Sequence, residues 1–220
     1  MSRFNKIDTI QLIRQTGIVP VFYNADAELT KKVVKACYDG GIRAFEFTNR
    51  GDGAHKVFEE VIAFVRRECP DMAFGAGTIL DARTAALYIQ MGADFLVSPC
   101  MAEEVVTLAN RRGIPYSPGC GTVTEIVRAQ ELGCDLVKVF PAGTVGGPAF
   151  VKNILAPLPW AMVMATGAVE PTEENLRNWA ASGVTAVGMG SKLFPKDKVS
   201  SGDWAGISAL CTKCLEWFRK

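Results

Sequence analysis

The sequence lacks an excess of charge of either sign. Its 24 lysine and arginine residues are balanced by 23 aspartate and glutamate residues, which leaves a net charge of +1 at neutral pH. Proteins that bind phosphate backbones or anionic lipid surfaces usually carry a clear excess of basic residues. We therefore expect no nucleic-acid partner and no membrane partner, and we expect the ligand to be a small molecule.

The sequence also lacks a long apolar run at its start. Charged residues are spread through the first 17 positions, MSRFNKIDTIQLIRQTG. A signal peptide needs an uninterrupted apolar centre, and a membrane-spanning helix needs about 20 apolar residues. The N-terminus predicts neither, and we expect a cytoplasmic protein.

Histidine is almost absent, because His55 is the only one in the chain. The seven cysteines are an odd number scattered along a chain without a secretion signal, which indicates reduced thiols. Cys211 and Cys214 have the spacing of half a zinc or redox site, but no second pair accompanies them, and a structural zinc site usually needs four ligands. We expect neither a metal nor another cofactor.

What the sequence does have is a recurring junction in which an amphipathic stretch ends at glycine and a β-branched or aromatic run begins. Examples are Gly41 before IRAFEF, Gly92 before ADFLV and Gly133 before CDLVKVF. Glycine readily adopts the left-handed conformation that closes a helix, and a short apolar run suits a strand buried on both faces. Each junction therefore predicts a helix followed by a parallel strand.

The whole pattern predicts a (β/α)8 barrel, the TIM barrel of the α/β class. We expect eight strands, near residues 17–22, 42–47, 72–76, 94–97, 114–117, 135–140, 161–165 and 184–188. We expect helices between them, for example around residues 26–39, 54–68, 81–91, 101–112, 122–132 and 172–182. A doubly wound open sheet is the alternative. Because no low-complexity linker interrupts the pattern, we expect a single domain over residues 1–220, ending in a helix from about residue 203.

One lysine lies inside an apolar strand, in the segment DLVKVFPA. Alternation along this strand puts Leu136, Lys138 and Phe140 on one face and Val137 and Val139 on the other. A valine pair suits packing against outer helices, so Lys138 is expected to point into the barrel. Since desolvation disfavours the charged ammonium, this lysine is expected to act as a neutral amine nucleophile, as Schiff-base chemistry requires.

A buried carboxylate is predicted in the second expected strand, near residues 42–47. In IRAFEFTNR, Glu46 shares a face with Ala44 and Thr48, and apolar surroundings raise the pKa of a carboxyl group toward neutrality, which suits proton transfer. A structural salt bridge between Glu46 and Lys138 is the alternative. Arg50, in the loop that follows, carries the planar fork that fits a carboxylate, although a solvated surface arginine is equally compatible with its position.

Two glycine-containing segments end the last two strands. TGA at 166–168 and GMGS at 188–191 bring backbone N–H groups and hydroxyls to the place where barrels frequently bind phosphate, next to a short helix that we expect from about Ser191. Glycines in ordinary tight turns are the alternative. The pair of segments favours a site for phosphate or another anion.

Taken in order, the segments FEFTNR, GAGTIL, FLVSPC, SPGCGTVTE, LVKVFPA, ATGAV and GMGS resemble those of the class I 2-keto-3-deoxy-6-phosphogluconate (KDPG) aldolases and the related 4-hydroxy-2-oxoglutarate aldolases. The resemblance runs from about residue 7 to 195. It implies a homotrimeric (β/α)8 barrel that reversibly cleaves a 2-keto-3-deoxy sugar acid phosphate to pyruvate and glyceraldehyde 3-phosphate without a metal.

The resemblance also implies roles for individual residues. Lys138 would form the Schiff base, Glu46 would move protons, and Arg50 and Thr78 would contact the pyruvate-derived part of the substrate. The remaining substrate-binding candidates are Pro99, Phe140, Thr166, Gly167, Ala168, Gly190 and Ser191, of which Thr166, Gly167 and Ser191 would contact the phosphate. The family's segments T-G-G and G-G-S are changed here, because Ala168 replaces a glycine and Met189 occupies the first position of the second segment.

Other functions remain open on sequence alone. The substrate could be the phosphogalactonate isomer or the smaller 4-hydroxy-2-oxoglutarate. A phosphate-binding barrel isomerase or synthase would use Lys138 only electrostatically, and a non-enzymatic sugar-phosphate sensor would need the anion-binding loops but not Lys138 with Glu46.

Overall fold

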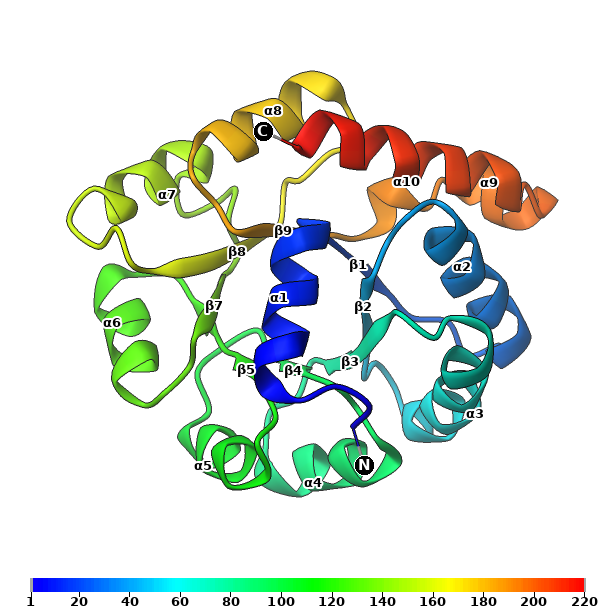
Figure 1. Cartoon of the computed structure of the whole chain (residues 1–220), viewed down its shortest axis with the longest axis horizontal. Helices are drawn as coiled ribbons and strands as arrows, with labels where there is room; N and C mark the ends of the chain where they lie inside the picture. The colour runs from blue at the N-terminus through cyan, green and yellow to red at the C-terminus, as the bar shows by residue number, and fades with distance from the viewer. Residues whose placement is uncertain (1, 220) are drawn as a thin grey trace.

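The computed structural model describes residues 2–219, which fold as strands alternating with helices (Figure 1). The strands are β1 (Ile18–Phe22), β2 (Ala44–Thr48), β3 (Ala73–Gly77), β4 (Leu96–Val97), β5 (Tyr116–Ser117), β6 (Gly119–Cys120), β7 (Leu136–Val139), β8 (Met162–Thr166) and β9 (Ala186–Met189). The helices are α1 (Lys6–Thr16), α2 (Ala27–Asp39), α3 (Ala54–Glu68), α4 (Ala82–Met91), α5 (Glu103–Arg112), α6 (Val123–Glu131), α7 (Gly147–Leu155), α8 (Glu173–Ala181), α9 (Lys196–Ser201) and α10 (Trp204–Phe218). A 3-10 turn, η1, spans Ser191–Leu193.

The strands are parallel and close into a barrel. Their order is β5-β4-β3-β2-β1-β9-β8-β7-β6, with β5 paired to β4 and β6 paired to β7. The two ends of this order are halves of one strand separated by Pro118, which has no N–H for the ladder but whose carbonyl accepts a hydrogen bond from the Lys138 N–H at 3.0 Å. The predicted (β/α)8 barrel is confirmed, and the open-sheet alternative is wrong.

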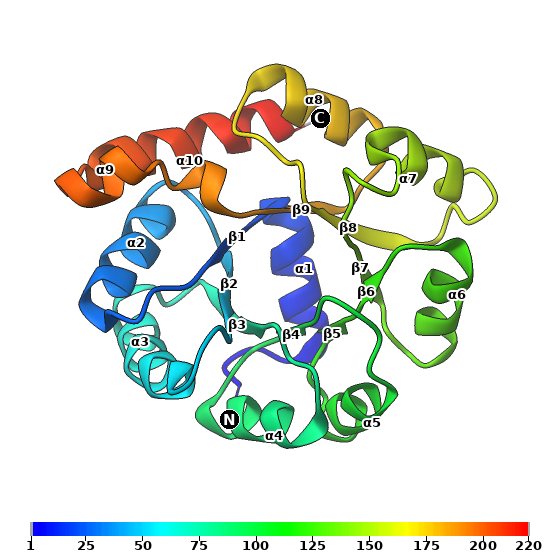
Figure 2. The same ribbon diagram turned by 180° about the vertical axis from the view of Figure 1, so that it is seen from behind.

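Helix α1 covers one end of the barrel and was not expected from the sequence. Asn5 caps it by accepting a hydrogen bond from the Asp8 N–H, and Gly17 ends it in the left-handed conformation with φ of 72°. Gly17 was expected to begin the first strand and instead separates α1 from β1. In both views α1 lies across the middle of the ring of strands (Figure 1 and Figure 2). Its Ile13 packs against Val19 and Leu136 near the strand starts, so the N-terminal end of the barrel is closed.

The buried apolar residues form two clusters, one inside the barrel and one between the strands and the outer helices. The inner cluster includes Ala44, Leu136 and Met164, whereas the outer cluster, between the strands and the helices, includes Val137 and Val139. This partition confirms the predicted alternation in β2 and β7. Gly75 in β3 belongs to the same interior, because a Cβ there would lie 2.4 Å from the Phe95 ring.

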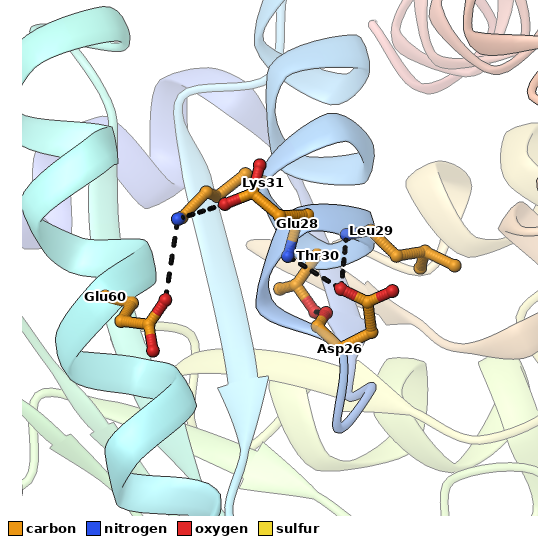
Figure 3. A network of polar contacts seen from close by, with 6 residues as sticks. All are labelled: Asp26, Glu28, Leu29, Thr30, Lys31 and Glu60. Carbon is orange, nitrogen blue, oxygen red and sulfur yellow. Dashed lines mark hydrogen bonds and ion pairs between the residues drawn. The ribbon is translucent and has the colours of Figure 1, made fainter.

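The outer helices are held to one another by packing and by a few surface ion pairs. Asp26 caps α2 by accepting hydrogen bonds from the N–H groups of Glu28 and Leu29, and Lys31 lies 2.6 Å from Glu28 and 3.6 Å from Glu60 of α3 (Figure 3). Exposed pairs of this kind add little to stability, so packing of the apolar faces is the main stabilising interaction between these helices.

Helix α10 is the expected C-terminal helix and packs against α2 and α8 on the outside of the barrel (Figure 1). Its contact with the end of α2 is close, because a Cβ on Gly40 would lie 2.5 Å from the Ser208 carbonyl oxygen. No helix within residues 2–219 is long and apolar enough to cross a membrane.

Candidate active site

Lys138 and Glu46 both lie inside the barrel, on opposite sides of the ring of strands. Lys138 on β7 is 5% exposed and Glu46 on β2 is 1% exposed. The predicted inward orientation of both side chains is therefore found in the structure. Lysine and glutamate are rarely fully buried unless they are paired. Both residues are therefore candidates for a chemical role rather than for packing.

The environment of Glu46 favours the protonated carboxyl group. Burial raises its pKa above the usual glutamate value, and the positive charges of Lys138 and Arg50 lower it by less. The Oε2 atom is buried and has no hydrogen-bond partner within residues 2–219. A purely structural salt bridge would require the carboxylate oxygens to be paired, so this open oxygen favours a chemical role.

Because Gly77 has no side chain, it leaves space for the Glu46 carboxyl group. A Cβ on Gly77 would lie 1.9 Å from Glu46 Oε1, so no larger residue fits beside this carboxyl group. Across the barrel, Lys138 Nζ lies 4.9 Å from the centroid of the Phe140 ring. Phe140 in turn lines the pocket described next, and so connects Lys138 to the open end of the barrel.

A pocket of about 250 Å³ opens at the C-terminal ends of the strands. Its lining includes these predicted site residues: Arg50, Phe140, Thr166, Gly167, Ala168, Gly190 and Ser191. The two glycine-containing segments and the arginine of the second βα loop are thus brought together. The pocket is also lined by Gly188, from the predicted GMGS segment, and by four residues that sequence reasoning missed: Val21, Val169, Glu170 and Lys192.

Two predicted site residues are in strained backbone. Thr78 and Ala168 have positive φ values of 61° and 59°, in the left-handed region that non-glycine residues avoid. They follow β3 and β8 at the open end of the barrel. Strain of this kind, worth about 1–3 kcal/mol, concentrates at functional sites and needs rigid surroundings to persist.

The two departures from the family's glycines leave the pocket open. The Cβ of Ala168 is accommodated by Gly143, because a Cβ at position 143 would lie only 2.4 Å from it. Met189 is fully buried in the outer cluster, so its side chain points away from the pocket. Gly188 lies against Thr166, a lining residue whose buried Oγ1 has no hydrogen-bond partner within the described residues.

The loop that carries Arg50 is fixed by contacts that the sequence did not reveal. The Asn49 N–H donates to the Gly77 carbonyl at 2.8 Å, and the Tyr88 hydroxyl donates to Asn49 Oδ1 at 2.9 Å. Burial raises the pKa of Tyr88, so its hydroxyl stays protonated and available as a donor. Tyr88 resembles any buried aromatic residue of an amphipathic helix, and no sequence signal distinguishes it.

Four predicted site residues do not line the pocket itself: Glu46, Thr78, Pro99 and Lys138. Thr78 follows Gly77, close to Glu46, and Pro99 lies against β6, where a Cβ on Gly119 would come within 2.1 Å of the Pro99 carbonyl oxygen. Within residues 2–219 there is no group of three or more histidine, cysteine, aspartate or glutamate side chains that could hold a metal ion.

Comparison with known proteins identifies this arrangement. Residues 9–210 match the model of the KDPG and KHG aldolase family, in which KHG denotes 4-hydroxy-2-oxoglutarate. The chain belongs to this family. The 2-dehydro-3-deoxy-phosphogluconate aldolase of Pseudoalteromonas atlantica is 33% identical over 98% of this chain and 97% of its own length. The KHG/KDPG aldolase of Escherichia coli is 32% identical over 93% of each chain.

Solved structures agree with this assignment. The KDPG aldolase of Legionella pneumophila, captured with pyruvate as a covalent carbinolamine intermediate, has a TM-score of 0.82 at 26% identity and covers 93% of this chain and 96% of its own. The family resemblance expected from the sequence is confirmed, and the present protein is an aldolase, a carbon–carbon lyase.

Proposed function

We propose that this aldolase acts through a Schiff base on Lys138 and reversibly cleaves 2-dehydro-3-deoxy-6-phosphogluconate to pyruvate and glyceraldehyde 3-phosphate. The observation that carries the proposal is the buried Lys138 together with Glu46, whose Oε2 has no hydrogen-bond partner in the described chain, beside a pocket that contains Arg50 and hydroxyl groups. The covalent carbinolamine captured in the Legionella pneumophila relative supports the same chemistry.

In the proposed mechanism the neutral amine of Lys138 attacks the C2 ketone of the substrate. Loss of water gives an iminium, which accepts the electron pair released when the C3–C4 bond breaks. Glu46 donates the proton that leaves with the water and takes the proton of the C4 hydroxyl. Burial raises the pKa of this carboxyl group above the usual glutamate value, which favours the protonated form that donates the first proton.

The remaining site residues would hold the substrate in line. Arg50 and Thr78 would bind the carboxylate, which keeps the C3–C4 bond aligned with the iminium. Thr166, Gly167, Gly190 and Ser191 would bind the distal phosphate. Phe140, Pro99 and Ala168 would form the walls, and no metal or other cofactor takes part.

A homotrimer in the cytoplasm is also proposed, with no nucleic-acid or membrane partner. Its support is the family resemblance and the balanced charge of the chain. Sedimentation analysis of the purified protein tests the trimer, and activity after treatment with a chelator tests metal independence.

The 4-hydroxy-2-oxoglutarate reaction is a second candidate, since the Escherichia coli relative is named for both substrates. An assay that captures released pyruvate with lactate dehydrogenase, run on the phosphogluconate, phosphogalactonate and hydroxy-oxoglutarate compounds, ranks them by kcat/KM. We expect the phosphorylated gluconate compound to give the highest value.

Borohydride treatment in the presence of pyruvate tests the Schiff base directly. We expect a stable adduct, located by peptide mass spectrometry on Lys138, and turnover that falls by about 10³-fold or more in Lys138→Ala, since the nucleophile is lost. Lys152→Ala, which removes an exposed lysine of α7, is the matched control and should keep full activity. Turnover that survives borohydride with substrate would support an isomerase or synthase. Ligand binding without cleavage, with equal binding by Lys138→Ala, would support a sensor.

A further inference from the structure

Two charged residues at the pocket have no part in the proposed mechanism. Glu170 and Lys192 both line it, and Glu170 Oε1 lies 3.6 Å from Lys192 Nζ. The side chains are 49% and 69% exposed, so the pair stands at the rim and is reached by solvent. Lys192 directly follows Ser191, a proposed phosphate contact.

The backbone on the Glu170 side is anchored to α8. The Glu170 N–H donates to Asn175 Oδ1 at 2.9 Å, and the Asn175 side-chain amide also lies 3.5 Å from the Ala168 carbonyl oxygen. One side chain at the start of α8 thus holds both ends of the short segment 168–170. The position from which the Glu170 carboxylate reaches over the pocket is therefore set by the fold.

The backbone on the Lys192 side is anchored to the outer core. Leu193 and Phe194 are buried, and the Phe194 ring packs against Phe22 with centroids 4.9 Å apart. This anchoring leaves Ser191 and Lys192 exposed. The backbones of both partners are fixed, whereas their long side chains can rotate to other partners.

We propose that Lys192 binds the distal anionic group of the substrate, with a preference for phosphate, and that Glu170 competes with that group for Lys192. This inference rests on the proposed function. In the free protein Lys192 is paired with Glu170, and in the complex it turns to the substrate anion. Exchange costs little because an exposed pair at this separation is weakly held.

The selection follows from charge. The Glu170 carboxylate competes with the substrate anion for the ammonium group of Lys192. A phosphate monoester, with a charge of roughly −2, competes more strongly than a single carboxylate, with a charge of −1. Lys192 therefore favours an aldehyde half that ends in phosphate over one that ends in a carboxylate, as in 4-hydroxy-2-oxoglutarate, whereas Glu170 lowers the affinity for both.

The test compares KM for three substrates: the phosphorylated gluconate compound, its unphosphorylated form and 4-hydroxy-2-oxoglutarate. For Lys192→Met we expect KM of the phosphorylated compound to rise about fivefold with kcat nearly unchanged, and KM of the unphosphorylated form to stay the same. For Glu170→Gln, which removes the competing carboxylate, we expect KM to fall for both anionic substrates, and by at least as large a factor for the phosphorylated compound.

Two further variants separate the charge from other effects. Lys192→Arg keeps the charge and should remain close to the wild type. Lys213→Met removes an exposed lysine of α10 that does not line the pocket and should leave every KM unchanged. An unchanged KM for the phosphorylated compound in Lys192→Met, or an equal rise for the unphosphorylated form, overturns the inference.

Borohydride trapping of pyruvate, which has no distal anion, distinguishes this inference from the proposed function. Normal trapping by every variant with no effect of Lys192→Met on KM overturns the role of Lys192 alone. Failure of trapping in the wild type overturns the proposed function, and the role of Lys192 with it.

Discussion

At the N-terminal end of the barrel, α1 covers the strands and Ile13 packs into an apolar cluster with Val19 and Leu136. At the C-terminal end, two buried oxygen atoms, on Glu46 and Thr166, have no hydrogen-bond partner within residues 2–219. The first end is closed by apolar packing, whereas the second end contains buried polar atoms without hydrogen-bond partners.

The change from an apolar to a polar barrel interior takes place within single strands. On β7 the inward side chain changes from Leu136 to Lys138, and on β2 from Ala44 to Glu46, in each case over two residues. The comparison teaches that the apolar end holds the strands rigid, and that this rigidity allows unpaired polar groups and positive φ values to persist at the open end.

Replacing Glu46 at the open end should have the largest effect on activity. We expect Glu46→Gln to lower kcat by about 10²–10⁴-fold, because general acid–base catalysis contributes that much, without loss of stability at neutral pH. Because burial raises its pKa, this carboxyl stabilises the fold at low pH, and that contribution is lost as pH rises above the ordinary glutamate value of 4.5. In chemical denaturation between pH 4 and 8, the free energy of unfolding of Glu46→Gln should therefore increase relative to that of the wild type as pH rises.

The control for this experiment is Glu60→Gln, which removes an exposed glutamate of α3 and should leave kcat unchanged. If Glu46→Gln instead kept its activity and lost stability at neutral pH, the structural salt bridge with Lys138 would be the better interpretation.

Replacing Ile13 should have the opposite effect, which is a loss of stability with activity retained. We expect Ile13→Ala to lower the free energy of unfolding by about 2–5 kcal/mol, since it removes a side chain that is 2% exposed and leaves a cavity. Activity at temperatures well below the melting transition should be retained. Ile7→Ala on the same helix removes a side chain that is 68% exposed and should change stability by less than about 0.5 kcal/mol.

A selective loss of kcat in Ile13→Ala, with the fold intact, would contradict the division between a structural and a chemical end. Calorimetry and steady-state kinetics on the same preparation make the comparison.

The smallest effect is expected from Tyr88→Phe, which changes a contact of the loop that follows β2. Loss of the hydroxyl that donates to Asn49 should loosen the loop carrying Arg50, raising KM for pyruvate in the condensation direction about threefold and lowering stability by about 1 kcal/mol. Tyr38→Phe removes an exposed hydroxyl contact with Asp71 and should change neither quantity. A rise in KM that is equal in both variants would show that the loop is not positioned by Tyr88.

Local patterns in the sequence were enough for the strands, for the faces of β2 and β7, and for the convergence of Arg50 with the two glycine-containing segments. These features follow from alternation and from the rule that parallel strands end at one mouth. Helix α1 was missed because its segment was considered only as a possible leader, and the division of the fifth strand at Pro118 was not anticipated.

The pairs Tyr88 with Asn49 and Glu170 with Lys192 were beyond sequence reasoning for a different reason. Tyr88 is separated from Asn49 by a helix and a strand, and Glu170 from Lys192 by another helix and strand. Contacts between neighbouring βα units depend on the spacing around the barrel, which no local pattern contains.

The sequence by itself determined that this chain forms a parallel barrel with an inward lysine and an inward glutamate, because side-chain period and helix caps are local properties. Only the tertiary structure decided that Glu46 keeps an unpaired oxygen, that Ala168 and Met189 leave the pocket open, and that Lys192 meets Glu170 at its rim. The physical reason is that burial, unsatisfied hydrogen bonds and the space around a Cβ are properties of all the elements that surround a residue, and these elements meet only when the barrel closes.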